Sequence, residues 1–152
     1  MRVLKIKWQR FVSDGQTCPR CSSTDKEIEK AISILKQVLA PLEIEVTIEK
    51  SELSVTEFSK NPLESNKIWI GDKPLEEWIN ATVGQSPCCE VCSPHECRTV
   101  EVEGKIYETI TADLIVKAGI HAALQLLNTE QNKPCCDDKD HKTGCLGKCT
   151  EA

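Results

Sequence analysis

Cysteine is the residue that most constrains what this chain can fold into. The 152 residues include ten cysteines, a share below the roughly 8–10% that marks small secreted scaffolds built on disulfides. They form three groups, which are Cys18 and Cys21; Cys88, Cys89, Cys92 and Cys97; and Cys135, Cys136, Cys145 and Cys149. Cysteines that act only as small apolar core residues would be scattered singly over apolar faces. The grouping therefore favours metal binding or thiol redox chemistry.

Charge and hydropathy limit where such a chain works. Lysine and arginine interrupt the first seven residues, where a secretory signal needs an unbroken apolar run, and no stretch approaches the roughly 18 apolar residues of a membrane span. The formal net charge of −5 gives no electrostatic case for binding nucleic acid or an anionic membrane surface. We expect a cytoplasmic protein with reduced cysteines, and dense reduced thiols point to metals or redox chemistry.

The first half of the chain predicts a strand, a CxxC motif, a helix and a second strand. Apolar and polar residues alternate over 4–8 and again over 44–48, the period of half-buried strands. Between them, apolar residues recur at helical spacing from Ile28 to Leu39. Thr24 and Glu27 have the spacing of a capping box, and Pro41 stops the helix. Such a unit should be right-handed with parallel strands.

The second half predicts shorter elements around a cysteine-rich insertion. The expected elements are short helices near Ser54 and after Pro74, a strand at 68–70, a hairpin with strands at 100–102 and 106–110, and a last helix at 112–127. Together they indicate an α/β protein with a mixed four- or five-stranded sheet flanked by helices. We expect one domain over residues 1–128, with a Cys-rich loop insertion at about 80–98. Residues 129–152 have little to pack, which predicts a flexible Cys-rich tail.

Cys18 and Cys21 are the candidate catalytic residues. Their motif, Cys18-Pro19-Arg20-Cys21, lies between a strand and a helix, the context of thioredoxin-like redox motifs. The positive end of a helix dipole and the cation of Arg20 both favour a thiolate, the form that attacks disulfides and binds metals. If the helix starts only at Thr24, the contribution of the dipole is weaker.

The central group, Cys88, Cys89, Cys92 and Cys97, is the stronger candidate for metal ligands. It places four thiols and the weaker candidate His95 within ten residues, and four Cys or His ligands suffice for a tetrahedral zinc site. The adjacent pair cannot easily ligate one tetrahedral ion and suits three-coordinate soft ions such as arsenite or a mercuric ion. An iron–sulfur cluster is another soft-ligand option. A redox-active disulfide and a purely structural role stay open as alternatives.

The tail cysteines repeat the adjacent-pair theme. Cys135, Cys136, Cys145 and Cys149 are further candidate metal ligands. Thiols on a flexible tail can pass a soft ion to a better-formed site or resolve a disulfide by exchange. The alternative is a tail without a role in folding or binding.

With these motifs in view, the chain resembles the prokaryotic thioredoxin-like family called domain of unknown function 2703. The resemblance covers roughly residues 5–127. It is carried by the segments 17–21, 63–70, 86–92, 98–102 and 104–110. The paired cysteines of the insertion and tail are also similar to those of thioredoxin-like arsenic metallochaperones.

The wider thioredoxin superfamily implies a four-stranded sheet flanked by helices. It also implies that Cys18 is the more exposed, attacking thiol and that Cys21 resolves. Glutaredoxins and thioredoxins carry a cis proline immediately before the third strand, facing the CxxC, whereas this chain has Asn66 and Lys67 there. The resemblance therefore implies more open space over the two thiols, which favours a bound metal.

These observations predict a thiol-based protein that binds a soft metal or metalloid ion, acting in its transport, sequestration or sensing. The first alternative is a thiol–disulfide oxidoreductase that uses Cys18 and Cys21 with a thiol redox partner protein. The second is an interaction module built on structural zinc.

Overall fold

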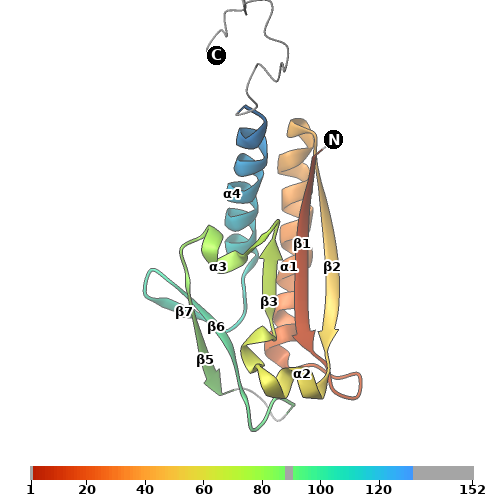
Figure 1. The fold of residues 1–152 in the computed structure, drawn as a ribbon, viewed down its shortest axis with the longest axis vertical. Helices are drawn as coiled ribbons and strands as arrows, with labels where there is room; N and C mark the ends of the chain where they lie inside the picture. The colour runs from red at the N-terminus through yellow and green to blue at the C-terminus, as the bar shows by residue number, and fades with distance from the viewer. Residues whose placement is uncertain (1, 88–90, 132–152) are drawn as a thin grey trace, which may run out of the picture.

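The computed structural model describes residues 2–87 and 91–131 of the chain (Figure 1). The elements are β1 (Arg2–Phe11), α1 (Pro19–Leu39), η1 (Ala40–Leu42), β2 (Ile44–Leu53), α2 (Val55–Lys60), η2 (Pro62–Glu64), β3 (Lys67–Ile70), β4 (Lys73–Pro74), α3 (Leu75–Trp78), β5 (Thr82–Pro87), β6 (Glu96–Val102), β7 (Lys105–Tyr107) and α4 (Ala112–Gln131). None of the helices in these ranges is both long and apolar enough to cross a membrane.

The strands form two sheets. A four-stranded sheet has the order β2-β1-β3-β4, in which β1 pairs with β2 in parallel and β3 is antiparallel to both β1 and β4. The chain thus forms the mixed α/β fold and the parallel strand–helix–strand unit that the sequence predicts. A separate antiparallel sheet has the order β5-β6-β7.

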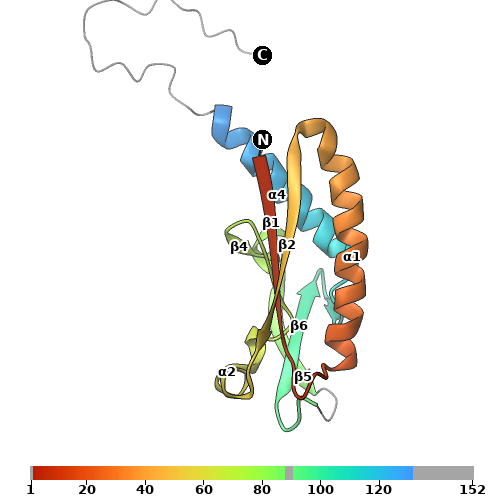
Figure 2. The same cartoon turned by 90° about the vertical axis from the view of Figure 1, so that its right-hand side faces the viewer.

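The long helices α1 and α4 pack against each other and against the four-stranded sheet (Figures 1 and 2). The strand residues that alternate inward, Leu4, Ile6 and Trp8 on β1, are at most 1% exposed. They join one apolar cluster with Ile28 and Leu35 of α1. The intervening residues of β1 are exposed, as period-two alternation requires of a sheet with one covered face.

The start of α1 corrects the sequence-based expectation. The helix begins at Pro19, five residues before Thr24, and Cys18 is its N-cap residue. Proline suits the first helical position because its missing N–H has no intrahelical partner there. The side chain of Cys18 accepts a hydrogen bond from the N–H of Cys21 at 3.5 Å. The CxxC motif therefore occupies the helix N-terminus itself.

Thr24 and Glu27 do not cap α1, because both side chains bind the chain entering α4. Thr24 Oγ1 accepts from the N–H of Ile110 at 3.2 Å, and a carboxylate oxygen of Glu27 accepts from the N–H of Ala112 at 2.8 Å. The bond from Ala112, helped by Lys30, lowers the pKa of Glu27 below its ordinary value. Thr24 and Glu27 are residue types that often cap helices, but in this protein they join α1 to the start of α4, which is distant in sequence.

Three further boundaries differ from expectation. The insertion is not only a loop, because it contains β5, and β6 begins at Glu96 rather than at Val100. The returning strand β7 is shorter than expected and ends at Tyr107. The last helix continues four residues beyond Leu127, to Gln131.

The capping box at Ser54 and Glu57 is confirmed. The N–H of Glu57 donates to the hydroxyl of Ser54 at 3.2 Å, and the N–H of Ser54 donates to the carboxylate of Glu57 at 3.3 Å. The tail cysteines and residues 88–90 lie outside the described residues.

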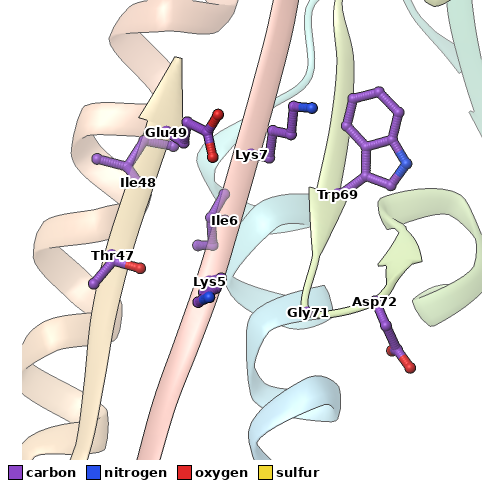
Figure 3. Close-up of a pocket in the computed structure, with 9 residues that line it drawn as sticks. All are labelled: Lys5, Ile6, Lys7, Thr47, Ile48, Glu49, Trp69, Gly71 and Asp72. Atoms are coloured by element: carbon purple, nitrogen blue, oxygen red, sulfur yellow. The ribbon is translucent and has the colours of Figure 1, made fainter. Parts of the chain in front are cut away.

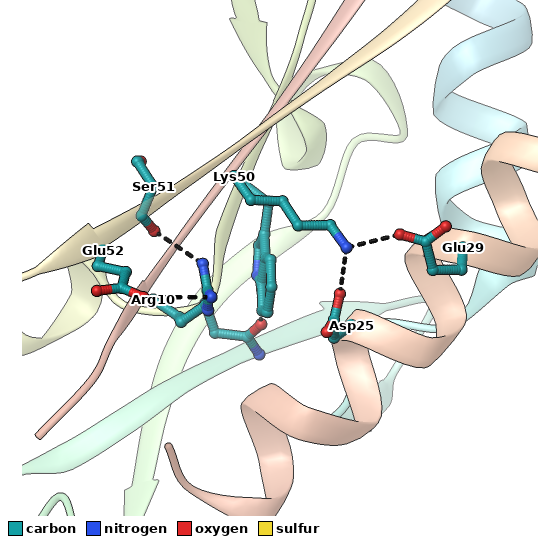
Figure 4. Close-up of polar contacts among 8 residues, drawn as sticks. Arg10, Asp25, Glu29, Lys50, Ser51 and Glu52 are labelled. Atoms are coloured by element: carbon teal, nitrogen blue, oxygen red, sulfur yellow. Dashed lines mark hydrogen bonds and ion pairs between the residues drawn. The ribbon is translucent and has the colours of Figure 1, made fainter. Parts of the chain in front are cut away.

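Ion pairs fix α1 against β2 on the half of the helix that carries the CxxC motif (Figure 4). Lys50 of β2 contacts Asp25 at 2.7 Å and Glu29 at 2.6 Å. On the neighbouring strand, Arg10 donates to the carbonyl oxygen of Ser51 and its guanidinium stacks over Trp8, 4.8 Å from the ring centroid. These contacts are partly exposed, so we assign them to orientation rather than to a large share of stability.

Candidate functional site

Three cysteines from two distant parts of the chain meet at the N-terminus of α1. Cys18 caps the helix, Cys92 lies in the turn that follows β5, and Cys97 is the second residue of β6. Their Sγ atoms all lie within 4.8 Å of one another, and each residue is at most 2% exposed. Sulfurs bound to one zinc ion at about 2.3 Å are about 3.8 Å apart. The Cys18–Cys92–Cys97 triad can thus hold a metal ion after shifts of about an ångström.

The surroundings of Cys18 favour its anionic form over its neutral form. Hydrogen bonds from the thiols of Cys21, Cys92 and Cys97, in that order of size, lower the pKa of Cys18 far below the ordinary value of a thiol, although burial opposes the shift. The hydrogen bonds from its neighbours therefore favour the thiolate form of Cys18. A soft cation would replace the protons that those neighbours carry.

Cys21 behaves in the opposite way. Its hydrogen bond to Cys18 raises its pKa above the ordinary value, and burial and the negative charge of Cys18 add to the effect. Its Sγ atom lies 3.8 Å from the hydroxyl oxygen of Ser65. Both cysteines of the motif are 1% exposed, so the implication that Cys18 is the more exposed thiol is wrong. Cys21 adjoins Cys18 and lies outside the triad.

The residues before β3 support this side of the site. The hydroxyl of Ser65 accepts a hydrogen bond from the N–H of Phe11 at 2.9 Å. Asn66, with a φ of 59°, accepts from the indole N–H of Trp8 at 3.1 Å. Polar residues thus occupy the stretch where the thioredoxin pattern has its proline. Sequence reasoning missed Ser65, and the available signal was its place just before the strand that faces the CxxC.

Arg20 ties the CxxC motif to both ends of the cysteine-rich segment. Its side chain is only 7% exposed and forms an ion pair with Glu108 at 3.5 Å. The guanidinium donates to acceptors on either side of the loop, at 3.1–3.4 Å: Ser86 Oγ and the carbonyl oxygens of Pro87, Cys97 and Arg98. Sequence reasoning treated Arg20 as a cation that stabilises the thiolate, whereas the hydrogen bonds that lower the pKa of Cys18 come from thiols. We call this set of contacts the Arg20 clamp.

A second buried arginine fixes the strand that carries Cys97. Arg98 is 4% exposed, and it donates to the carbonyl oxygen of Leu63 at 2.7 Å and pairs with the carboxylate of Glu76. β6 is thereby anchored to η2 and α3. The backbone of Cys97 is therefore held by Arg20, which binds its carbonyl oxygen, and by the anchored neighbour Arg98.

The other predicted ligands are placed differently. His95 packs edge-on against Phe58, with ring centroids 5.4 Å apart. The backbone N–H of His95 donates to the carbonyl oxygen of Cys92 at 2.9 Å and closes the turn that carries this cysteine. The group of described residues placed so that it could hold a metal ion contains only cysteines. Cys88, Cys89, Cys135, Cys136, Cys145 and Cys149 lie outside the described residues.

A hollow in the described surface lies away from the triad. It measures about 550 Å³ and lies on the uncovered face of the four-stranded sheet, where Lys5, Lys7, Thr47 and Trp69 line it (Figure 3). The Nζ atom of Lys7 lies 5.4 Å from the centroid of the Trp69 ring. The described residues that line this hollow include no cysteine or histidine. We place the candidate site at the triad, because its chemistry is the more specific.

Comparison with known proteins places the triad in a shared domain. A protein of Archaeoglobus fulgidus described only as an uncharacterized protein is 49% identical over 112 residues, which is 74% of this chain and 82% of that protein. No solved structure matches the chain. The family model described as Domain of unknown function (DUF2703) matches residues 4–119, a range that contains the triad and Cys21 and excludes the tail cysteines. The chain therefore belongs to this family of domains of unknown function.

Proposed function

We propose that the protein binds a soft metal or metalloid ion through Cys18, Cys92 and Cys97. The observation that carries the proposal is the convergence of three buried sulfurs from two distant parts of the chain. Idle cysteines in a core are usually scattered, whereas thiolates gathered in one place are the ligands that soft ions select. The fold that presents them is, in this proposal, thioredoxin-like, since a CxxC motif opens the helix of a parallel strand–helix–strand unit.

The positions of the supporting residues favour a preorganised site. The Arg20 clamp holds both ends of the segment that carries Cys92, and Arg98 holds the strand that carries Cys97. Such supporting contacts orient ligands, and their loss typically costs 10–100-fold in metal affinity. Binding therefore does not have to pay the chain entropy of bringing the ligands together, because the fold has already done so.

A second candidate function is thiol–disulfide exchange by Cys18 and Cys21. The lowered pKa of Cys18 favours it, because the thiolate is the attacking form. The deep burial of both sulfurs works against the approach of a protein disulfide. A Cys18–Cys21 disulfide would also take one ligand from the triad, so the two functions exclude each other at any one moment.

A cadmium titration tests the binding function. The protein used is the full chain with serine at positions 135, 136, 145 and 149, called here the tail-serine protein. We expect one equivalent of cadmium to bind to this protein after anaerobic reduction, seen as the ultraviolet absorption band of thiolate-to-cadmium charge transfer. The absence of any such band at one equivalent would contradict the proposal.

The matched control is Cys92→Ser in the same background. It should lower the intensity of the band and weaken binding, because one of the three sulfurs is lost. Unchanged binding by this variant would place the ion away from the triad.

A further inference from the structure

We propose that the triad takes a trivalent metalloid, of the arsenic(III) or antimony(III) class, in preference to a divalent metal ion. This inference rests on the function proposed above and names the class of ion for the same site. Three features carry it: the number of converging sulfurs, the charge of their surroundings and the exclusion of water.

The number of sulfurs matches a three-coordinate ion. Arsenic(III) forms three bonds to sulfur in a pyramid and needs no fourth ligand, whereas structural zinc is almost always four-coordinate. The triad supplies three sulfurs within 4.8 Å of one another. The adjacent thiol of Cys21 is already hydrogen-bonded to Cys18, and it lies 3.8 Å from the hydroxyl oxygen of Ser65. The described part of the chain thus presents a group of three.

The surroundings favour a complex without net charge. Three thiolates and a trivalent ion sum to zero, whereas a divalent ion leaves one negative charge on residues that are at most 2% exposed. A buried charge without a partner is costly. Among the described residues, the buried cations at the thiol-bearing segment are Arg20 and Arg98, and each already has a carboxylate partner: Glu108, at 3.5 Å from Arg20, and Glu76, which pairs with Arg98. The neutral complex avoids this cost.

Burial also protects the bonds that would form. For three protonated thiols, binding proceeds as As(OH)₃ + 3 RSH → As(SR)₃ + 3 H₂O, in which three As–O bonds break, three As–S bonds form and arsenic remains trivalent. Where one sulfur starts as a thiolate, one proton is taken up from solution so that the third hydroxyl group also leaves as water. The reverse reaction needs three water molecules, and the surroundings of a site control the access of solvent to it. Sulfurs that are almost fully buried therefore slow the hydrolysis of the bonds once they have formed.

Proton balance distinguishes the two classes of ion. Arsenous acid brings three hydroxyl groups that each take up a proton to leave as water, whereas an aqueous divalent ion brings none. For the same three thiols, zinc binding must release three more protons than arsenite binding. This difference holds whatever the protonation of the free thiols, so it depends only on how many sulfurs bind.

The experiment titrates the reduced tail-serine protein with arsenite and, separately, with zinc, in dilute buffer with a pH indicator. We expect one arsenic per chain, a difference of three protons between the two ions, and an intact mass showing that arsenic has replaced three hydrogens. In direct competition, arsenite should occupy at least tenfold more sites than equimolar zinc. In Cys18→Ser the adduct should retain only two sulfur bonds.

Three results overturn the inference while leaving the binding function intact: displacement of arsenite by equimolar zinc, an arsenic adduct with two replaced hydrogens in the tail-serine protein, or a difference of four protons with four thiols bound to zinc. Failure of both ions to bind would instead overturn the proposed function. Full retention of a three-sulfur adduct in Cys18→Ser would move the metalloid site away from the triad and contradict the inference.

Discussion

Replacing Cys18 with serine is expected to weaken ion binding by at least about a hundredfold. Structural zinc sites in small peptides contribute about 10–16 kcal/mol of binding free energy. An equal share of this binding free energy for each of three thiolates is about 3 kcal/mol or more. Each 1.4 kcal/mol corresponds to a factor of ten in affinity. Hydrogen bonds from the other thiols also lower the pKa of Cys18, which favours the form that binds a cation. Isothermal titration of the tail-serine protein and its Cys18→Ser variant measures the effect.

Cys21→Ser is the matched control, since it changes the same motif on the same helix. Serine can still donate a hydrogen bond to Cys18, so affinity should stay within about threefold of the parent value. Thiol–disulfide exchange needs both cysteines and would be lost in either variant. Equal loss of ion affinity in the two variants would mean that Cys21 is itself a ligand, and would contradict a site confined to the triad.

Arg20→Lys is expected to lower ion affinity by about 10–100-fold, the usual cost of losing a contact that orients a ligand. Lysine keeps the positive charge but cannot reproduce the planar fork of donors. The four acceptors of the clamp lie at both ends of the cysteine-rich segment. Without the fork, Cys92 and Cys97 should lose their fixed position relative to Cys18.

Glu108→Gln is the control for charge. The carboxylate of Glu108 is 64% exposed, and exposed ion pairs contribute little. We expect its ion affinity to change by less than about threefold. The same competition titration serves both variants. Wild-type affinity in Arg20→Lys would show that the cysteine-rich segment holds its place without the clamp.

The sequence predicted the parallel strand–helix–strand unit because its signals are local. Alternation over β1 and β2 and helical spacing over α1 each arise from burial of one face of one element. The start of α1 was missed because its N-cap is a cysteine rather than one of the usual capping residues. Thr24 and Glu27 looked like caps, yet their side chains bind the entry to α4, a contact across more than eighty residues.

The triad itself could not be read from spacing. The spacing of the cysteines predicts two separate sites, a redox motif at Cys18 and Cys21 and a self-contained metal loop at the central cysteines. Their meeting depends on the pairing of β5 with β6 and on the Arg20 clamp, which are long-range contacts. β5 gave little warning, since its residues are only partly buried and lack apolar alternation. The grouping of cysteines predicts metal binding or thiol redox chemistry, and the fold determines which of the cysteines are neighbours.

X-ray absorption at the edge of bound cadmium tests the central claim most directly, because it counts the sulfur atoms around the ion. The tail-serine protein and its Cys18→Ser variant would be loaded with cadmium at concentrations high enough to saturate both. Three sulfur neighbours in the tail-serine protein and one fewer in Cys18→Ser would agree with a site that joins the CxxC motif to Cys92 and Cys97. The same sulfur count in both proteins would contradict it and assign the ion to cysteines other than Cys18.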